Sequence, residues 1–145
     1  MRLVIQRVHE SKVEVEGKIV GQIGPGFMVL IGVTEGDNEE TADFLAEKLC
    51  NLRVFTDEED KMNLSIKDID GELLIISQFT LYADCRKGNR PSFIAAAEPK
   101  RAEELYEYFA RKCKEKVKNV EKGIFGAHMD VSLINNGPVT IMLEK

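Results

Sequence analysis

Two short stretches carry the side chains best suited to chemistry. Ser77-Gln78-Phe79-Thr80 places two hydroxyls and an amide around an aromatic ring, at the end of an apolar run that begins at Leu73. Strand ends are where side chains and free N–H groups become available to a ligand. The second stretch, Asn135 to Thr140, contains Gly137-Pro138. Its backbone can approach another molecule closely because Gly137 has no Cβ.

The hydroxyl groups of Ser77 and Thr80 fit hydrogen-bonding roles better than a triad nucleophile. A nucleophilic Ser or Thr normally needs a base, and no His or carboxylate is adjacent in the sequence. His9 and His128 are the only histidines, and nothing in the sequence places either beside the hydroxyls. The backbone N–H groups of Phe79 and Thr80 are candidates for an oxyanion site in acyl transfer.

The Asn135–Thr140 stretch lies between two apolar runs, 128–134 and 139–143, that both have strand character. Because Pro cannot donate to a sheet ladder, Gly137-Pro138 must form a bend, a bulge or the first residues of a strand. An isolated Asn-Gly pair is more typical of an ordinary hairpin turn. The residue pattern leaves both interpretations open.

The remaining sequence predicts the elements that position these stretches. Residues 27–33 form an apolar run typical of a strand buried on both faces. Asp37 or Asn38 can cap a helix that runs to about Cys50, and Pro99 suits the first turn of a helix that runs to about Val117. We expect a hairpin around 16–18 and loops at 56–70 and 83–92. The expected strands are 2–9, 13–15, 19–23, 27–33, 52–55, 72–79, 120–125, 129–134 and 139–143.

This pattern favours an α+β fold, formed by one domain over residues 1–145. Its core is a barrel-like or two-layer β-sheet with two main helices. A length of 145 residues is enough for a proper hydrophobic core. No apolar run approaches transmembrane length, and Met1-Arg2-Leu3-Val4 leads directly into a strand pattern rather than a signal peptide. We therefore expect no membrane association and a cytoplasmic location.

Charge and cysteine content exclude several classes of protein. The net charge of −5 argues against generic nucleic-acid binding. However, residues 35–60 carry a balance of −8 and residues 86–122 a balance of +5, which permits a basic face. Three cysteines without C-x-x-C spacing and only two histidines predict no disulfide framework, no metal site and no cofactor.

Ser77-Gln78-Phe79-Thr80 together with Asn135-x-Gly137-Pro138-x-Thr140 resembles the D-aminoacyl-tRNA deacylases, also called D-tyrosyl-tRNA deacylases. The resemblance covers nearly the whole chain. Further stretches that resemble the family, in order, are Gln6-Arg7-Val8, Gly26–Val33, Leu81–Asp84, Arg90–Phe93 and Gly126–Met129. Neither motif is specific alone, but the pair at this spacing is a strong signal. The variable position of the second motif is Asn136 here, where Asp is more usual.

The resemblance implies a homodimer that hydrolyses the ester between a D-amino acid and the 3′ end of tRNA, with active sites at the subunit interface. It implies that the Gly137-Pro138 bond is cis, reaches into the partner subunit and receives the substrate's α-ammonium group on its two carbonyl oxygens. An L side chain would then clash with this backbone, whereas glycine would pass.

The resemblance also implies roles for the other motif residues. Gln78 and Phe79 would hold the terminal ribose and the ester, beside Ser77 and Thr80. Met129 would pack near the adenine. Arg7 would orient the Gly-Pro loop, in which Asn135 is the first motif residue. Attack by water assisted by the RNA 2′-hydroxyl is a simpler hypothesis than a Thr80 nucleophile, because an aminoacyl ester is already activated.

Plainer interpretations stand beside these. Arg7 alternates with apolar residues and could extend along a strand to solvent, and Met129 would be a core methionine by default. Arg86, Lys87 and Arg90 form either a solvated loop or a phosphate contact. At the level of function, the alternatives are a catalytically silent nucleic-acid-binding dimer and an esterase for small D-amino-acid esters.

Overall fold

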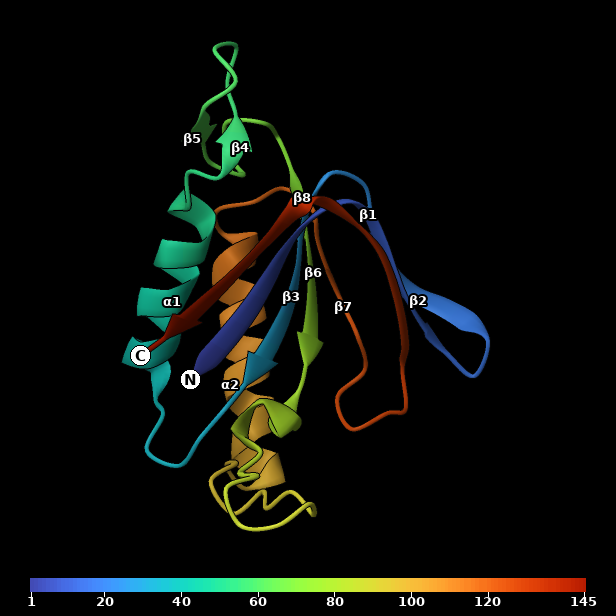
Figure 1. The fold of residues 1–145 in the computed structure, drawn as a ribbon, viewed down its shortest axis with the longest axis vertical. Helices are drawn as coiled ribbons and strands as arrows, with labels where there is room; N and C mark the ends of the chain where they lie inside the picture. Colours follow the sequence, from blue (N-terminus) through green and yellow to red (C-terminus); the bar gives the residue numbers. More distant parts are fainter.

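One mixed sheet and two helices make up most of the chain in the computed structural model, which describes residues 1–145 (Figure 1). The strands are β1 (Arg2–Val15), β2 (Lys18–Ile23), β3 (Gly26–Gly32), β4 (Phe55–Thr56), β5 (Met62–Leu64), β6 (Glu72–Ser77), β7 (Val120–Lys122) and β8 (Asp130–Glu144). The helices are α1 (Glu39–Asn51), α2 (Pro99–Lys114) and the short 3₁₀ helix η1 (Phe79–Tyr82). The expected α+β class is confirmed.

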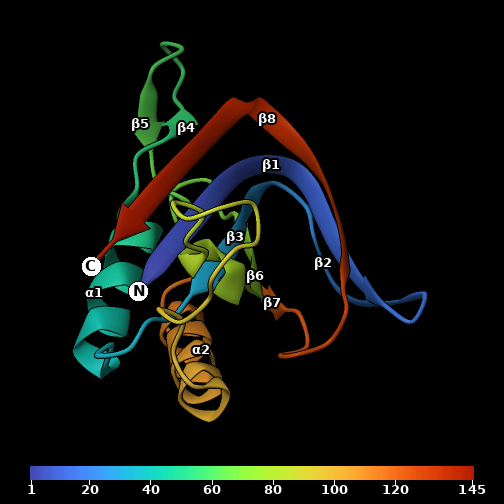
Figure 2. The same cartoon turned by 60° about the horizontal axis from the view of Figure 1, so that its bottom comes forward.

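The main sheet has the strand order β2-β1-β3-β6-β7, and β8 pairs along the other side of β1. The pairs of β1 with β2, β3 and β8 are antiparallel, whereas β3–β6 and β6–β7 are parallel. The sheet curls until β2 faces β7, so that it nearly closes into a barrel (Figure 2). Gly21 permits this approach, because a Cβ there would lie 2.9 Å from the carbonyl oxygen of Lys122.

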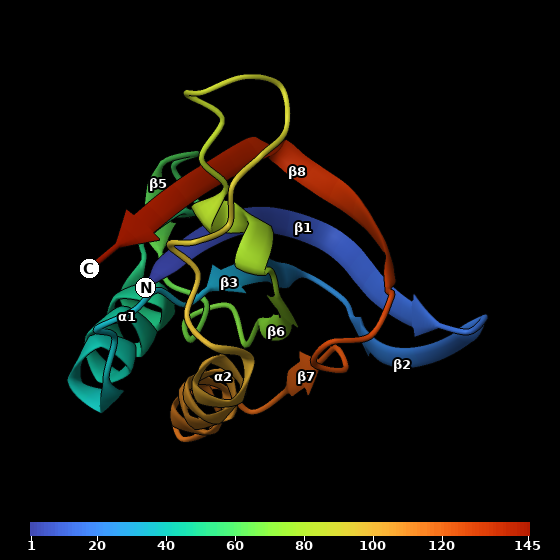
Figure 3. The same ribbon diagram turned by 90° about the horizontal axis from the view of Figure 1, so that it is seen from below.

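Both faces of the sheet are covered, and this explains the continuous apolar run of β3. The larger hydrophobic cluster lies between the sheet and the two helices and contains Phe27, Val29 and Ile31. Met28 points the other way, into a smaller cluster that includes Leu74 of β6. Seen from below, α1 and α2 lie on one side and the curled sheet on the other (Figure 3). The prediction of a strand buried on both faces is confirmed.

The two helices begin as their sequences predict. The Asn38 side chain accepts a hydrogen bond of 3.0 Å from the Thr41 N–H and caps α1. Pro99 occupies the first turn of α2, where its missing N–H costs no helical hydrogen bond. The end of α2 differs from expectation: the helix stops at Lys114, and Val117 lies beyond it.

Several expected boundaries are wrong. Residues 2–9 and 13–15 belong to one continuous strand, β1. The strand expected at 52–55 is only β4, at Phe55–Thr56, and the expected loop 56–70 contains its antiparallel partner β5. The strand expected at 72–79 ends at Ser77, and the strand expected at 120–125 ends at Lys122.

The Asn135–Thr140 stretch is not a hairpin turn. The runs on either side of it, expected as two strands, are the two halves of β8, and both halves pair with β1. The register shifts where residues 136–139 find no partner on β1. The stretch is therefore a bulge in one long edge strand, the class of structure that a Pro in a sheet requires.

Candidate active site

The first motif, Ser77–Thr80, lies where the chain leaves the sheet at the end of β6. The four residues before Ser77 are fully buried between β3 and β7, which fixes the direction in which the chain emerges. The Gln78 N–H donates to the Ile31 carbonyl oxygen at 2.8 Å and makes the last sheet contact. The chain then turns into η1, in which the Leu81 N–H donates back to the Gln78 carbonyl oxygen at 3.2 Å.

A cavity of about 450 Å³ opens beside this strand end. Its walls are mostly apolar, as is typical of small-molecule sites. The lining residues are Ile31, Val33, Ile76, Ser77, Gln78, Phe79, Pro99, Ala102, Tyr106, Val131 and the segment Phe125–Met129. Gly123 leaves room for Met129 in the wall, because a Cβ at Gly123 would lie 2.5 Å from the Met129 sulfur. Met129 is therefore a cavity residue as well as a packing residue.

No general base contacts the hydroxyl groups of the first motif. The Gln78 amide donates to the Thr80 hydroxyl, and neither Ser77 nor Thr80 makes a hydrogen bond to a His or a carboxylate. His128 is at the rim of the cavity, but its side chain is 96% exposed and its ionic neighbour is Asp130 at 4.0 Å. The arrangement offers hydrogen-bonding groups at the cavity, but it contains no assembled triad.

Tyr106 forms a rigid, neutral part of the cavity wall. Its hydroxyl donates to the Ile75 carbonyl oxygen at 2.9 Å, close to the Gly123 carbonyl oxygen at 3.3 Å. Burial raises the pKa of the Tyr106 phenol well above its usual value, because the phenolate would be desolvated. The side chain therefore shapes the cavity and does not exchange a proton near neutral pH.

A buried arginine, Arg7, contacts the backbone of the second motif, Asn135–Thr140. Arg7 is only 7% exposed, so the interpretation that it extends to solvent is wrong. Its Nε donates to the Asn136 carbonyl oxygen at 3.0 Å and its Nη1 to the Val54 carbonyl oxygen at 2.5 Å. The guanidinium group makes no ion pair with a carboxylate. Arg7 thus connects the bulge in β8 to the chain that precedes β4.

Asn135 fixes the other side of the bulge. Its Oδ1 accepts a hydrogen bond of 3.2 Å from the Val139 N–H, across the bend, and its Nδ2 donates to Gln6 Oε1 at 2.7 Å. Between these anchors, Gly137 has φ +126° and the Gly137–Pro138 peptide bond is cis. Both residues are exposed. The second motif therefore presents bare backbone to the surroundings from a firmly held base.

Within one chain, the two motifs lie at opposite ends of the sheet. Val8 pairs with both Asn135 and Gly26, and Gly26 pairs with Glu72, so the bulge lies level with the start of β6. Ser77 is five residues further along, a distance of about 17 Å at strand spacing. Figure 1 shows the bend of β8 at the upper end of the sheet and the short light-green helix η1 below the lower end of β6.

The structure therefore groups the expected site residues into two separate clusters. The first cluster consists of Ser77, Gln78, Phe79, Thr80 and Met129. The second cluster consists of Arg7, Asn135, Gly137 and Pro138.

Sequence reasoning missed several cavity residues. Phe125 falls in an expected strand, and Ala102 and Tyr106 fall in the expected helix that begins at Pro99, but all three line the cavity. A signal for Phe125 was present: it directly precedes the family-like Gly126–Met129 stretch. No group of three or more His, Cys, Asp or Glu side chains is placed to hold a metal ion. Neither helix is long and apolar enough to cross a membrane.

Comparison with known proteins shows close full-length relatives. The D-Tyr-tRNA(Tyr) deacylase family model matches residues 4–144. A D-aminoacyl-tRNA deacylase from Thermosipho africanus is 60% identical over 145 residues, which is 100% of this chain and 97% of the relative. The Brevibacillus brevis D-aminoacyl-tRNA deacylase is 56% identical, with 100% of both chains covered.

Two solved structures have the same fold as this chain. The c-Myc DNA Unwinding Element Binding Protein superimposes with a TM-score of 0.95 at 38% identity, over 100% of this chain and 99% of that one. A probable eukaryotic D-amino acid tRNA deacylase has the same fold, with a TM-score of 0.83 at 20% identity over 98% and 97% of the two chains. The chain therefore belongs to the D-aminoacyl-tRNA deacylase family, whose members are hydrolases that act on aminoacyl-tRNA.

Proposed function

We propose that this deacylase works as a homodimer, in which the Ser77–Thr80 cluster of one subunit faces Gly137-Pro138 of the other. The observation that carries the proposal is the distance of about 17 Å between the two motifs in one chain. Two groups so far apart cannot hold the amino group and the ester of one aminoacyl residue. A second copy of the chain supplies the missing half.

The free edge of β8 supports such an assembly. β8 pairs with β1 on one side only, which leaves an edge of 15 residues unpaired. Long free edges are usually blocked or used for association. Ile134 and Met142, on this strand, are 53% and 62% exposed. A subunit contact would remove these apolar groups from water.

The proposed site discriminates between D- and L-aminoacyl esters by shape. The carbonyl oxygens of Gly137 and Pro138 accept the substrate's α-ammonium group, while the ester is held at the end of β6. With both groups fixed, one direction is open for a side chain. A D side chain points outward, an L side chain meets the Gly137-Pro138 backbone, and glycine passes because it has none. Rejection by a clash can exceed discrimination by one favourable contact.

The nucleoside end of the substrate fits the cavity. We place the adenine against Met129 in the mostly apolar space of about 450 Å³, with the ribose and the ester at Gln78 and Phe79. The first N–H groups of a 3₁₀ helix have no acceptor inside the helix, so those of Phe79 and Thr80 are suited to an oxyanion. Water assisted by the RNA 2′-hydroxyl attacks the ester carbonyl and releases the D-amino acid and tRNA.

The experiment that tests this function is a side-by-side deacylation of D-Tyr-tRNA and L-Tyr-tRNA by the purified protein. We expect rapid loss of the D-ester while the L-ester survives, and light scattering should report a dimer. Equal hydrolysis of both esters would leave a deacylase but would refute the Gly137-Pro138 filter. A strictly monomeric protein with full activity would refute the shared site.

A second candidate function is nucleic-acid binding without catalysis. It is favoured by the name of one structural neighbour, a DNA unwinding element binding protein. This function predicts binding of tRNA with no loss of either ester in the same assay.

For the deacylase we propose a cytoplasmic location, where tRNA is charged.

A further inference from the structure

An exposed apolar patch adjoins the cavity at the end of β6. It consists of Phe79, Phe93 and Ile94, which are 57%, 37% and 92% exposed. The rings of Phe79 and Phe93 meet edge to face with their centroids 5.0 Å apart. Phe79 also lines the cavity, so the patch continues directly from the place proposed for the terminal nucleoside.

The loop that carries Phe93 is held at both ends. The backbone groups of Asp84 and Ser92 exchange two hydrogen bonds of 2.8 and 2.9 Å. The Thr34 hydroxyl donates to the Ala95 carbonyl oxygen at 2.5 Å, and the Ala97 N–H donates to the Val33 carbonyl oxygen at 3.0 Å. The aromatic patch is therefore presented in a defined position before any partner binds.

The same loop carries positive charge that is only partly compensated. Between residues 85 and 97 there are three basic residues and no acidic residue. Arg86 is paired with Asp84, but Lys87 and Arg90 have no ion-pair partner. By contrast, the lysines near the end of α2 are largely neutralised: Lys112, Lys116, Lys118 and Lys122 each pair with a carboxylate.

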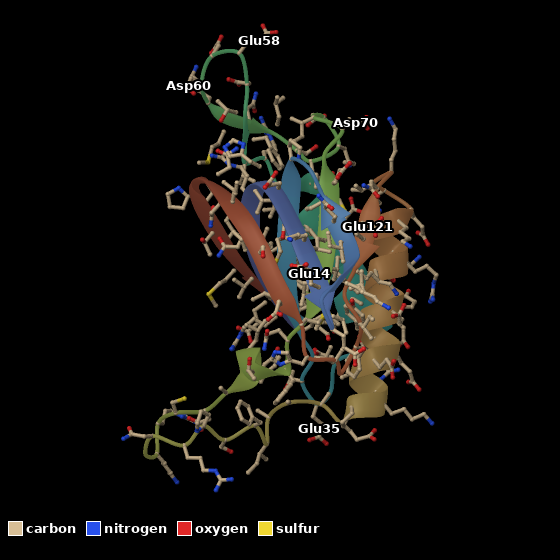
Figure 4. The ribbon with its side chains drawn as sticks, turned by 90° about the vertical axis from the view of Figure 1, so that its right-hand side faces the viewer. Glu14, Glu35, Glu58, Asp60, Asp70 and Glu121 are labelled. Carbon is tan, nitrogen blue, oxygen red and sulfur yellow. The ribbon has the colours of Figure 1, made fainter.

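Figure 4 shows where this loop lies relative to the acidic side chains. The loop between η1 and α2 projects from the body at one end, and nitrogen-tipped side chains extend from it. Of the labelled acidic side chains, Glu58 and Asp60 lie on the β4–β5 hairpin at the opposite end, whereas Glu35 lies at the same end as the loop. The unpaired charges of Lys87 and Arg90 therefore favour the approach of a polyanion to the end of the molecule where the cavity opens.

We propose that the Phe79–Phe93–Ile94 patch and the loop bases bind the unpaired nucleotides that precede the terminal adenosine of tRNA. One base stacks on the exposed face of Phe93 beside Ile94, and the phosphates run along Lys87 and Arg90. Stacking platforms next to cationic side chains are the usual means of binding single-stranded nucleic acid. This inference rests on the proposed function, because it places the terminal adenosine in the adjacent cavity.

A protein partner would suit the apolar patch alone, but not its surroundings. The uncompensated charges on Lys87 and Arg90 favour a polyanion. RNA single strands are recognised by aromatic stacking combined with phosphate contacts, and both elements occur together here. Contact between subunits is the competing use of this surface, and the test includes it as an outcome.

The test compares two substrates of different length, D-Tyr-tRNA and the D-tyrosyl ester of adenosine, which ends where the patch begins. In Phe93→Ala we expect the ratio of kcat/KM on tRNA to kcat/KM on the adenosine ester to fall about tenfold, the effect of losing one stacked base. The loss should appear in KM, with kcat on tRNA retained. Phe44→Ala is the matched control, because Phe44 is a 40% exposed aromatic on α1, outside the cavity.

An equal loss on both substrates would overturn the proposal, since Phe93 would then act at the ester. No loss on either, or dissociation of a dimer by Phe93→Ala, would overturn it as well. Binding of a fluorescent four-nucleotide RNA ending in CCA, followed by anisotropy, tests the patch without hydrolysis. Phe93→Ala should weaken this binding about tenfold, and unchanged binding would refute the patch even where the deacylase function holds.

The proposed phosphate contacts of Lys87 and Arg90 are tested separately, by the dependence of RNA affinity on salt concentration. In Lys87→Gln/Arg90→Gln, the dependence of log affinity for the same RNA on log salt should flatten by about 1.4, or 0.7 for each of two lost phosphate contacts. Lys18→Gln, at the exposed β1–β2 hairpin, is the control. An unchanged slope would exclude these two residues from the phosphate path.

Discussion

Replacing Gly137 by Ala tests how the bulge in β8 is held. A Cβ at this position would lie 2.9 Å from Val139 Cγ2 and 3.0 Å from Arg7 Nη2. Ordinary contacts begin near 3.4 Å, so something must shift by about half an ångström. The φ of +126° adds backbone strain of about 1–3 kcal/mol for any L-residue with a side chain.

A matched control separates the backbone strain of an alanine at residue 137 from the displacement of its neighbouring atoms. Gly36 also has a positive φ, of 90°, but a Cβ there meets nothing within 4 Å. Gly36→Ala should therefore lose stability in chemical denaturation without losing activity. Because a misplacement of about 1 Å can cost about a hundredfold in rate, a shift of half that size predicts about a tenfold lower kcat/KM on D-Tyr-tRNA for Gly137→Ala.

The assay is steady-state deacylation of D-Tyr-tRNA, with unfolding in urea measured on the same preparations. Displacement of the bulge is refuted if Gly137→Ala retains the activity of Gly36→Ala while both are folded. It is also refuted if the two variants lose activity in parallel, because the effect would then be general strain.

Three further outcomes are expected. Thr80→Val should keep kcat on D-Tyr-tRNA within about tenfold of wild type, because no base activates the hydroxyl; complete loss of turnover with intact binding would make Thr80 the nucleophile. Burial raises the pKa of Tyr82 from 10.0 to about 12, so its contribution to stability is complete below pH 10 and is lost as the pH rises from 10 to 12. Since its hydroxyl has no hydrogen-bond partner, Tyr82→Phe should be neutral or stabilising at pH 7 and should flatten this alkaline loss in urea titrations; a large loss of stability at pH 7 would show a hidden partner. A thiol reagent should modify only the exposed Cys85 in the native protein, and the buried Cys50 and Cys113 only after denaturation; rapid native reaction of more than one thiol per chain would contradict the packing between α1 and α2.

The parts of the fold that the sequence predicted well are those in which local signals and burial agree. The Asn38 cap, the Pro99 start and the doubly buried β3 each follow from one dominant effect. β8 could not be predicted from local signals, because Asn136-Gly137 is good hairpin sequence. The long antiparallel pairing with β1 overrides that preference and absorbs the stretch as a bulge.

In the candidate site too, local signals predict the motifs but not their arrangement in space. Residue types and the family resemblance identify the two motifs, but the separation of the motifs depends on the register of β1 with β3 and β8, which sequence patterns do not contain. Arg7 illustrates the limit most clearly. Its alternation with apolar residues suggested an exposed side chain, whereas the structure buries it because two carbonyl oxygens replace its hydration.

The claim that one site needs two chains is tested most directly by mixed dimers. One subunit carries Gly137→Ala, which damages the bulge, and the other carries Gln78→Ala, which damages the strand end. If each site combines Ser77–Thr80 of one chain with Gly137-Pro138 of the other, the mixed dimer contains one undamaged site. It should recover about half of the wild-type rate on D-Tyr-tRNA, well above either parent homodimer. A mixed dimer no more active than the mean of its two parents would contradict the shared site.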